Sequence, residues 1–150
     1  MHTSSSLFSF LLLGLPSATA QWCKGQPNTP GYCTPLTWTD LTKADSPKTG
    51  ECEDACRGVA SDAGDWGANL TGLPAGQRHS VVGYACGFSL GRGPNQPDPI
   101  EFDFQNQDIL DVYQGAIDRF ATADGRVAAT GTMTCQGRAC SGGWTDGSGC

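Results

Sequence analysis

The stretch QDILDVYQGAIDRFATADGRVAATGTMTC, residues 107–135, predicts a helix, a turn and a strand in succession. Across residues 107–121 the apolar side chains recur every three or four positions, which is typical of an amphipathic helix. Asn106 precedes this helix as a cap, and Asp108 stands in its first turn, where the helix dipole favours a negative charge. An Asp-Gly pair then ends the helix, and the threonine-rich residues 126–135 return as a strand.

Four further elements are expected upstream of this stretch. Residues 32–40 favour a strand with Pro35 at its start or on a sheet edge, because proline cannot donate to a ladder. Residues 51–62 favour a helix that follows Thr49 as a possible cap. Apolar side chains alternate over residues 80–90 and again over 100–105, which predicts two strands joined as a hairpin.

The resulting order is strand, helix, strand, strand, helix, strand. This order predicts an α+β protein with the split β-α-β arrangement of ferredoxin-like sandwiches. In that arrangement a four-stranded antiparallel sheet is covered on one face by both helices, and their apolar stripes form the core with it. We expect disulfides to reinforce such a small fold.

The N-terminus indicates the compartment. Residues 7–15 form a mostly apolar run, and Ala18-Thr19-Ala20 then has the small-x-small spacing that signal peptidase accepts. The run is shorter than the roughly 20 apolar residues that a membrane-spanning helix needs. We therefore expect residues 1–20 to be a secretory signal peptide and residues 21–150 to be one extracellular cysteine-rich domain, with a core at about residues 32–135.

Secretion favours disulfides among the eight cysteines of the chain. Their pairing stays open, but Cys52 and Cys56 are four residues apart on the predicted helix and should bridge to different partners. The irregular spacings do not fit a zinc site, so neither a metal nor a cofactor is expected. The predicted disulfide cysteines are Cys23, Cys33, Cys52, Cys56, Cys86, Cys135, Cys140 and Cys150.

The charge balance restricts the partners. Nine Lys and Arg stand against fifteen Asp and Glu, which leaves a formal net charge of −6. A net negative protein is repelled by nucleic acids and by anionic lipid surfaces. We expect a monomer that neither binds nucleic acid nor inserts stably into membranes, and whose partner is an extracellular host or microbial protein or a cell-wall component.

Few residues could support catalysis. His79 is the one histidine of residues 21–150, and no nucleophile motif accompanies it. A ribonuclease-like enzyme could pair His79 with Glu101 or Asp103, and a glycosidase could use those two carboxylates, but their spacing more simply marks the wet face of a strand. We therefore assign no catalytic residue and expect no enzyme.

Binding is the more plausible activity. Asp108, Asp111 and Asp118 are expected to form the solvated face of the second helix. Trp22, Trp38, Trp66 and Trp144 could stack on sugar rings at a cell wall; Trp38 is expected in the core, and Trp66, in a glycine-rich loop, is the best exposed candidate.

Asn69 begins the sequence Asn-Leu-Thr, which is an acceptor motif for N-linked glycans. In a secreted protein such a motif predicts a glycan on an exposed loop.

The stretch at residues 107–137 resembles the C-terminal half of secreted fungal effectors of the necrosis-inducing-factor family. In those proteins a helix led by aspartate and isoleucine runs into a glycine-containing turn and a strand of the form V-x-A-x-G-x-M-x-C. The resemblance extends upstream through ECEDACRGV, SVVGYACGFSL and the leading CKGQPNTPGYCTPLTW. It ends at RACSGGWTDGSGC, where one more ordered segment would be expected.

This resemblance implies a fold and a role. Family members are similar in architecture to small killer toxins, which carry an α/β sandwich. The implied function is that of a secreted virulence effector that binds host or competitor targets outside the cell. A killer-toxin-like antimicrobial protein, a cell-wall carbohydrate binder and a ribonuclease-like enzyme are the alternatives.

Overall fold

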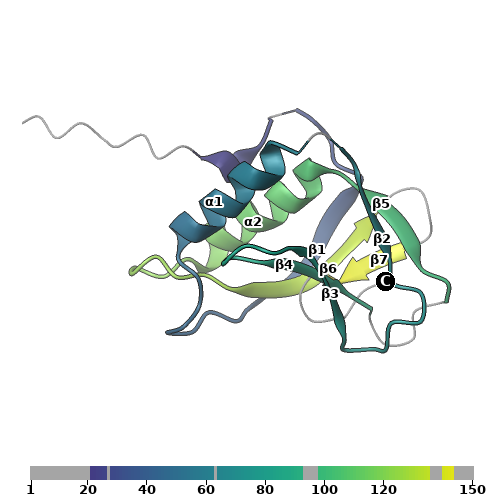
Figure 1. Cartoon of the computed structure of the whole chain (residues 1–150). Coiled ribbons are helices and arrows are strands. Elements are labelled where there is room, and N and C mark those ends of the chain that lie inside the picture. The colour runs from purple at the N-terminus through teal and green to yellow at the C-terminus, as the bar shows by residue number, and fades with distance from the viewer. Residues whose placement is uncertain (1–20, 27, 63, 93–97, 136–139, 144–150) are drawn as a thin grey trace, which may run out of the picture.

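The computed structural model describes residues 21–26, 28–62, 64–92, 98–135 and 140–143 (Figure 1). The predicted leader, Trp144, Cys150 and the side chain of Cys140 lie outside the described part. In chain order the elements are η1 (Trp22–Lys24), β1 (Cys33–Asp40), α1 (Thr49–Ala60), β2 (Trp66–Asn69), β3 (Arg78–Val82), β4 (Phe88–Gly91), β5 (Glu101–Phe104), α2 (Asn106–Phe120), β6 (Ala129–Cys135) and β7 (Cys140–Gly143).

Helix α1 forms where its pattern predicts, with its start displaced. Its N-cap is Lys48 rather than Thr49, which is already helical. Glu51, at the third helical position, accepts a hydrogen bond of 2.7 Å from the backbone N–H of Lys48 through Oε2. This satisfies one of the donors that a helix start leaves unpaired. The buried face consists of Cys52, Ala55, Cys56 and Val59.

Helix α2 also forms where predicted, capped by Gln105 rather than Asn106. The first half of its apolar stripe is buried, at Ile109, Leu110, Val112 and Tyr113. The second half, at Ala116, Ile117 and Phe120, is partly buried against the core. Figure 1 shows α1 and α2 side by side on the same side of the strands.

The main sheet has five strands in the order β1-β6-β7-β4-β3, and every pair in it is antiparallel. The longest pairing joins β1 to β6, from Cys33 opposite Cys135 to Asp40 opposite Ala129. Strand β1 lies at one edge of this sheet, as Pro35 predicts, and the register shifts between Pro35 and Thr37. The expected four-stranded, ferredoxin-like sheet is therefore wrong, although the α+β class with antiparallel strands and two helices is confirmed.

The error arises in residues 80–90, which form two strands instead of one. The chain turns back between Val82 and Phe88, so that β3 and β4 pair with each other. Gly87 suits this turn, because a Cβ atom there would lie 3.1 Å from the carbonyl oxygen of Val82. Tyr84, one of the alternating apolar side chains of residues 80–90, would face the core in a single strand but is 56% exposed in the turn.

The predicted hairpin partner of residues 100–105 is also wrong. Strand β5 pairs with β2, from Trp66 opposite Phe104 to Asn69 opposite Glu101, in a separate two-stranded sheet. The sequence analysis missed β2 because its four residues contain a glycine and are too few to show a period.

Three disulfides close the described part of the chain. They join Cys23 to Cys56, Cys33 to Cys135, and Cys52 to Cys86. Cys52 and Cys56 thus bridge to different partners, as their spacing predicts. The first bridge fastens η1 to α1, the second joins the start of β1 to the end of β6, and the third joins α1 to the turn between β3 and β4.

Candidate functional site

The structure separates the side chains that were considered for catalysis. His79 is exposed on β3, opposite Leu90 of β4 in the five-stranded sheet. Glu101 and Asp103 are exposed on β5, in the two-stranded sheet. Glu101 Oε1 accepts a hydrogen bond of 2.7 Å from the side-chain amide of Asn69. The histidine and the two carboxylates therefore belong to different sheets.

Asn69, the predicted glycan acceptor, is exposed at the end of β2. Its Oδ1 accepts a hydrogen bond of 2.9 Å from the backbone N–H of Thr71. This is the short local turn that asparagine side chains often form. Glycosylation at this exposed amide stays a prediction.

The tryptophans divide into packed and exposed side chains. Trp66 was expected to be the best exposed, which is wrong: it is half-buried, stacks on Phe104 with ring centroids 6.3 Å apart, and donates through Nε1 to Asn106 Oδ1 at 2.5 Å. Trp38 packs against the core with the Arg119 guanidinium 4.6 Å above its ring. Trp22 is 42% exposed.

Asp108 was expected on the solvated face of α2, and this expectation is wrong. Asp108 is only 3% exposed, whereas Asp111 and Asp118 are exposed as predicted. Its Oδ1 accepts from the backbone N–H of Cys33 at 2.7 Å, and its Oδ2 accepts from Tyr32 at 3.0 Å and Gln105 at 2.7 Å.

Two effects act in opposite directions on this carboxyl. Burial raises the pKa of Asp108, and the three backbone amides that donate to it oppose this rise. The side chain caps α2 and at the same time holds the start of β1 against it. Asp108 therefore has a structural role at the helix start.

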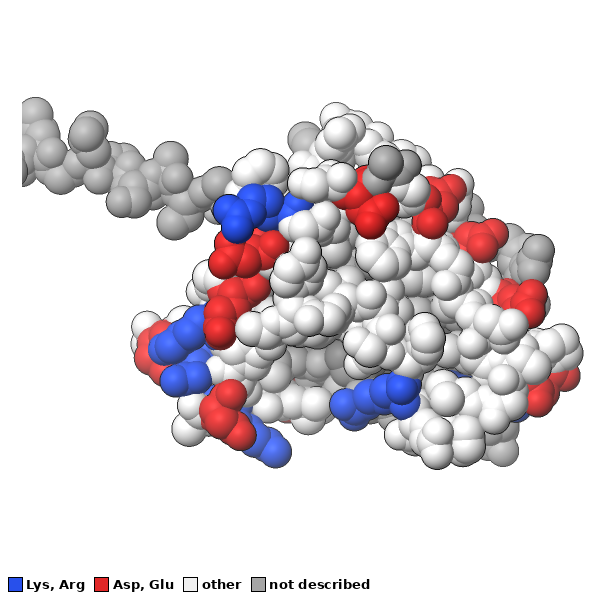
Figure 2. Space-filling model, in the orientation of Figure 1, with Lys and Arg blue, Asp and Glu red and all other residues white. Residues whose placement is uncertain are grey.

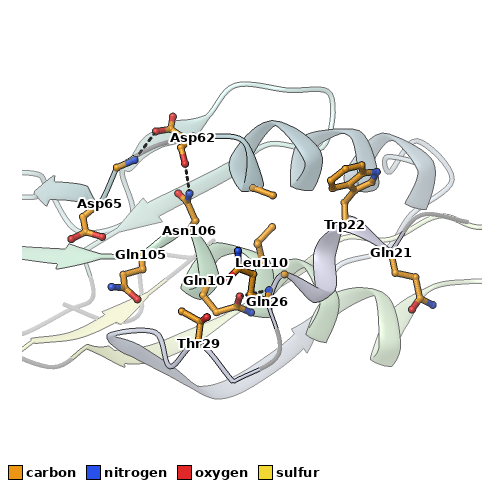
Figure 3. Close-up of a pocket in the computed structure, with 13 residues that line it drawn as sticks. Gln21, Trp22, Gln26, Thr29, Asp62, Asp65, Gln105, Asn106, Gln107 and Leu110 are labelled. Atoms are coloured by element: carbon orange, nitrogen blue, oxygen red, sulfur yellow. Dashed lines mark hydrogen bonds between the residues drawn. The ribbon is translucent and has the colours of Figure 1, made fainter.

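A cleft of about 640 Å³ opens next to this helix start (Figure 3). Three segments line it: η1 with the loop that follows it, the end of α1 with the loop after it, and the first residues of α2. In the view of Figure 3, Trp22 stands at one end of the cleft and Asp65 at the other.

Two of the cleft's amide side chains hold its walls together. Gln107 accepts from the backbone N–H of Gln26 at 3.1 Å and donates to Asp111 Oδ1 at 2.7 Å. Asn106 donates to the carbonyl oxygen of Asp62 at 2.8 Å and accepts from Trp66. The bond between Gln107 and Gln26 joins α2 to the loop after η1, and the bond between Asn106 and Asp62 joins α2 to the residues that follow α1.

A second group of polar side chains lines the cleft with no partner among the described residues: Gln21, Gln26, Thr29, Asp65 and Gln105. Gln105 is the most notable of them, because its Oε1 is shielded from solvent and yet accepts no hydrogen bond. A buried acceptor without a donor is costly unless something else supplies the donor. The feature of the sequence that could have indicated this cleft is the run of three amide residues at positions 105–107, because a helix start needs only one such residue as a cap.

Metal ligands do not gather in the part of the chain that the structure describes: no group of three or more His, Cys, Asp or Glu side chains there could hold an ion. Among the same residues, no helix is both long and apolar enough to cross a bilayer.

Comparison with known proteins gives one match. Residues 32–135 match the model of the Hce2 family, whose description is pathogen effector and putative necrosis-inducing factor. No curated protein and no solved structure matches. The matched residues contain both helices and the α-helical walls of the cleft, whereas η1 and the loop after it precede them.

Proposed function

The chain belongs to the Hce2 family of pathogen effectors, and we propose that it is a secreted effector that acts outside the producing cell by binding a host or competitor target, without catalysis. The family match carries this proposal, because it covers residues 32–135 and therefore most of the chain.

The disulfides support secretion. Stable structural disulfides form in oxidising compartments and are rare in the cytosol. Three of them fasten η1, β1, α1 and the β3–β4 turn of this chain. The signal peptide predicted at residues 1–20 agrees with this route.

The side chains in the cleft support binding rather than turnover. Amide groups donate and accept hydrogen bonds but exchange no proton at neutral pH, so they recognise a ligand without serving as general acid or base. The acid-base candidates His79 and Glu101 lie on different sheets and do not line this cleft. Two carboxylates, Asp62 and Asp65, do line it, but both are exposed, whereas the general acid of a glycosidase is typically shielded from water.

The charge distribution supports a partner other than nucleic acid or an anionic membrane. Figure 2 shows acidic side chains along much of the border of one face, with basic side chains single or beside acidic ones. No broad basic surface appears on this face, and such a surface is what phosphate backbones require.

The test is infiltration of purified, disulfide-intact protein into leaves of several plant genotypes, with a parallel growth assay on competing fungi. We expect a response in some genotypes or competitors, its loss after reduction and alkylation, and its retention in His79→Ala, which changes an exposed residue outside the cleft. Turnover of RNA or wall polysaccharide would overturn the non-catalytic proposal. Dye leakage from protein-free vesicles would instead indicate a membrane toxin.

A further inference from the structure

We propose that the cleft between η1, the end of α1 and the start of α2 binds a neutral oligosaccharide through its unpartnered amide side chains and the exposed Trp22 indole. This inference rests on the proposed function, because it names the chemical class that an extracellular binding protein of this kind would recognise. The volume of the cleft, about 640 Å³, lies within the range of roughly 300–1,000 Å³ that is usual for small-ligand sites.

The hydrogen-bonding groups match sugar hydroxyls. A hydroxyl group donates one hydrogen bond and accepts others, so it can satisfy the oxygen and the nitrogen of a planar amide at once. Gln105 offers a shielded Oε1 that lacks a donor, and Gln26 and Gln21 offer amide side chains without partners among the described residues. A ligand hydroxyl that donates to Gln105 would remove the cost of this buried acceptor.

The charge of the lining favours a neutral ligand. No Lys or Arg is among the described residues that line the cleft, while Asp62 and Asp65 both line it. An anionic ligand would therefore meet carboxylates and no counter-charge. A cationic ligand is less suited, because both carboxylates are exposed, where ion pairs contribute little, and the remaining polar groups are uncharged.

Apolar surface is available for the carbon–hydrogen faces of sugar rings. The Trp22 indole is exposed at one end of the cleft, and Ala60 and Leu110 also line it (Figure 3). An indole presents a large, rigid apolar face together with one polar group. This combination of an aromatic surface with neighbouring planar amides suits a ligand that has both apolar faces and hydroxyl rims.

The walls are held in place before any ligand arrives. The Cys23–Cys56 disulfide fastens η1 to α1, and the backbone N–H of Trp22 donates to Glu53 Oε2 at 2.7 Å. Gln107 joins the loop after η1 to α2 through the backbone N–H of Gln26. A site ordered in this way loses little conformational entropy on binding.

The experiment is titration calorimetry on the secreted, disulfide-intact protein with cellohexaose, laminarihexaose and chitohexaose. An oligogalacturonate and a lysine-rich peptide are the charged comparison probes. We expect at least one neutral hexaose to bind and both charged probes to fail. Binding of no neutral hexaose, or of a charged probe alone, would overturn the proposal.

The matched variants are Gln105→Ala and Gln114→Ala, both on or next to α2. Each side chain has a buried Oε1 without a partner, but Gln114 does not line the cleft. Loss of one or two hydrogen bonds in Gln105→Ala should weaken the affinity about tenfold, with no change in Gln114→Ala. Trp22→Ala should weaken it as well. Equal affinities in Gln105→Ala and Gln114→Ala would place the ligand elsewhere and contradict the proposal.

Gln105→Met guards against a folding artefact, since it keeps the length of the side chain and removes both its hydrogen-bond acceptor and its donors. It should bind as weakly as Gln105→Ala while its urea midpoint stays at that of the wild type, because Oε1 of Gln105 has no partner in the free protein. The leaf assay then separates the two proposals: a leaf response without sugar binding would overturn the saccharide site and leave the effector role standing.

Discussion

Two polar junctions link segments that are about equally far apart in the chain, and they differ in burial. At the first, the backbone N–H of Cys33 donates to Asp108 across 75 residues. At the second, Lys48 Nζ donates to the carbonyl oxygen of Asp124 at 2.6 Å across 76 residues. Asp108 is 3% exposed, whereas the side chains of Lys48 and Asp124 are 46% and 61% exposed.

This difference determines what each junction contributes. Water can replace the exposed side-chain contacts between Lys48 and Asp124, so breaking one of them lowers the free energy of unfolding only slightly. The hydrogen bond from the Cys33 amide to Asp108 is buried and those from Tyr32 and Gln105 are partly buried, so removing the carboxylate leaves donors without a partner where water has little access. Equal chain separation therefore does not imply equal stabilisation, and the predictions below test this contrast.

The largest effect is expected at the buried junction. Asp108→Ala removes the acceptor of one buried and two partly buried backbone N–H groups, and because a buried donor left unpaired costs about 1–3 kcal/mol, it should lower the free energy of unfolding by about 3 kcal/mol. Urea unfolding measures this. Asp118→Ala, on the exposed face of the same helix, is the control and should change the midpoint very little. If both variants unfold at the same urea concentration, the buried junction does not stabilise the protein.

A smaller loss of stability is expected when an added atom crowds the Asp108 side chain than when that side chain is removed. A Cβ atom at Gly31 would overlap Oδ1 of Asp108, whose carboxylate is held in place by three hydrogen bonds. Gly31→Ala should therefore cost roughly 1–3 kcal/mol, as overpacking usually does. Gly50→Ala is the matched control: Gly50 lies in α1 with nothing within 4 Å of the added atom, and alanine there should stabilise by up to about 1 kcal/mol. A neutral Gly31→Ala would show that the carboxylate can move aside.

The two junctions should respond to pH in opposite directions. Burial raises the pKa of Asp108 above the ordinary 3.8, so the pH-dependent part of its contribution to stability is present in full below that pH and is lost as the pH rises through the raised pKa of the folded state. The hydrogen bonds that the carboxylate accepts from three backbone amides persist above that pKa. A hydrogen bond from the Thr122 hydroxyl, aided by the charge of Lys48, lowers the pKa of Asp124 below 3.8. That contribution is present above pH 3.8 and is lost as the pH falls through the lowered pKa.

Urea midpoints of the wild type, Asp108→Asn and Asp124→Asn between neutral and strongly acidic pH check these signs. The stability difference between the wild type and Asp108→Asn should grow on acidification, and that between the wild type and Asp124→Asn should shrink. Two differences that change in the same direction would contradict the assignment of one of the carboxyls.

The smallest effect is expected at Lys48. Lys48→Ala removes an exposed ion pair with Asp124, 3.4 Å long, and should shift the urea midpoint only slightly, with the shift disappearing at high salt. Lys43→Ala, another exposed lysine, serves as the control. A shift in Lys48→Ala as large as that in Asp108→Ala, and independent of salt, would remove the contrast between the two junctions.

The helices could be predicted because their signals are local. The apolar stripe of α2 and the spacing of Cys52, Ala55, Cys56 and Val59 in α1 depend only on positions three or four residues apart. Their caps were each misplaced by one residue, since Lys48 and Gln105 cap through the backbone and are poor caps by composition.

The strand pairings could not be predicted in the same way. Alternation over residues 80–90 suits one strand as well as two, and the turn at Gly83 and Gly87 is selected by the Cys52–Cys86 disulfide and by the pairing of β3 with β4. A partner for β5 could not be identified without β2, whose four residues carry no periodic signal.

The sequence by itself determined the class of this protein: two amphipathic helices, antiparallel strands, cysteines suited to disulfides and an excess of acidic residues, all of which follow from composition and short-range spacing. Tertiary structure alone decided that Asp108 is buried, that Trp66 is packed and that Gln105 lines a cleft. The physical reason is that burial depends on which distant segment covers a side chain. A helical pattern shows which face Asp108 occupies, but two of the three amides that make its burial tolerable belong to Tyr32 and Cys33, 76 and 75 residues earlier in the chain.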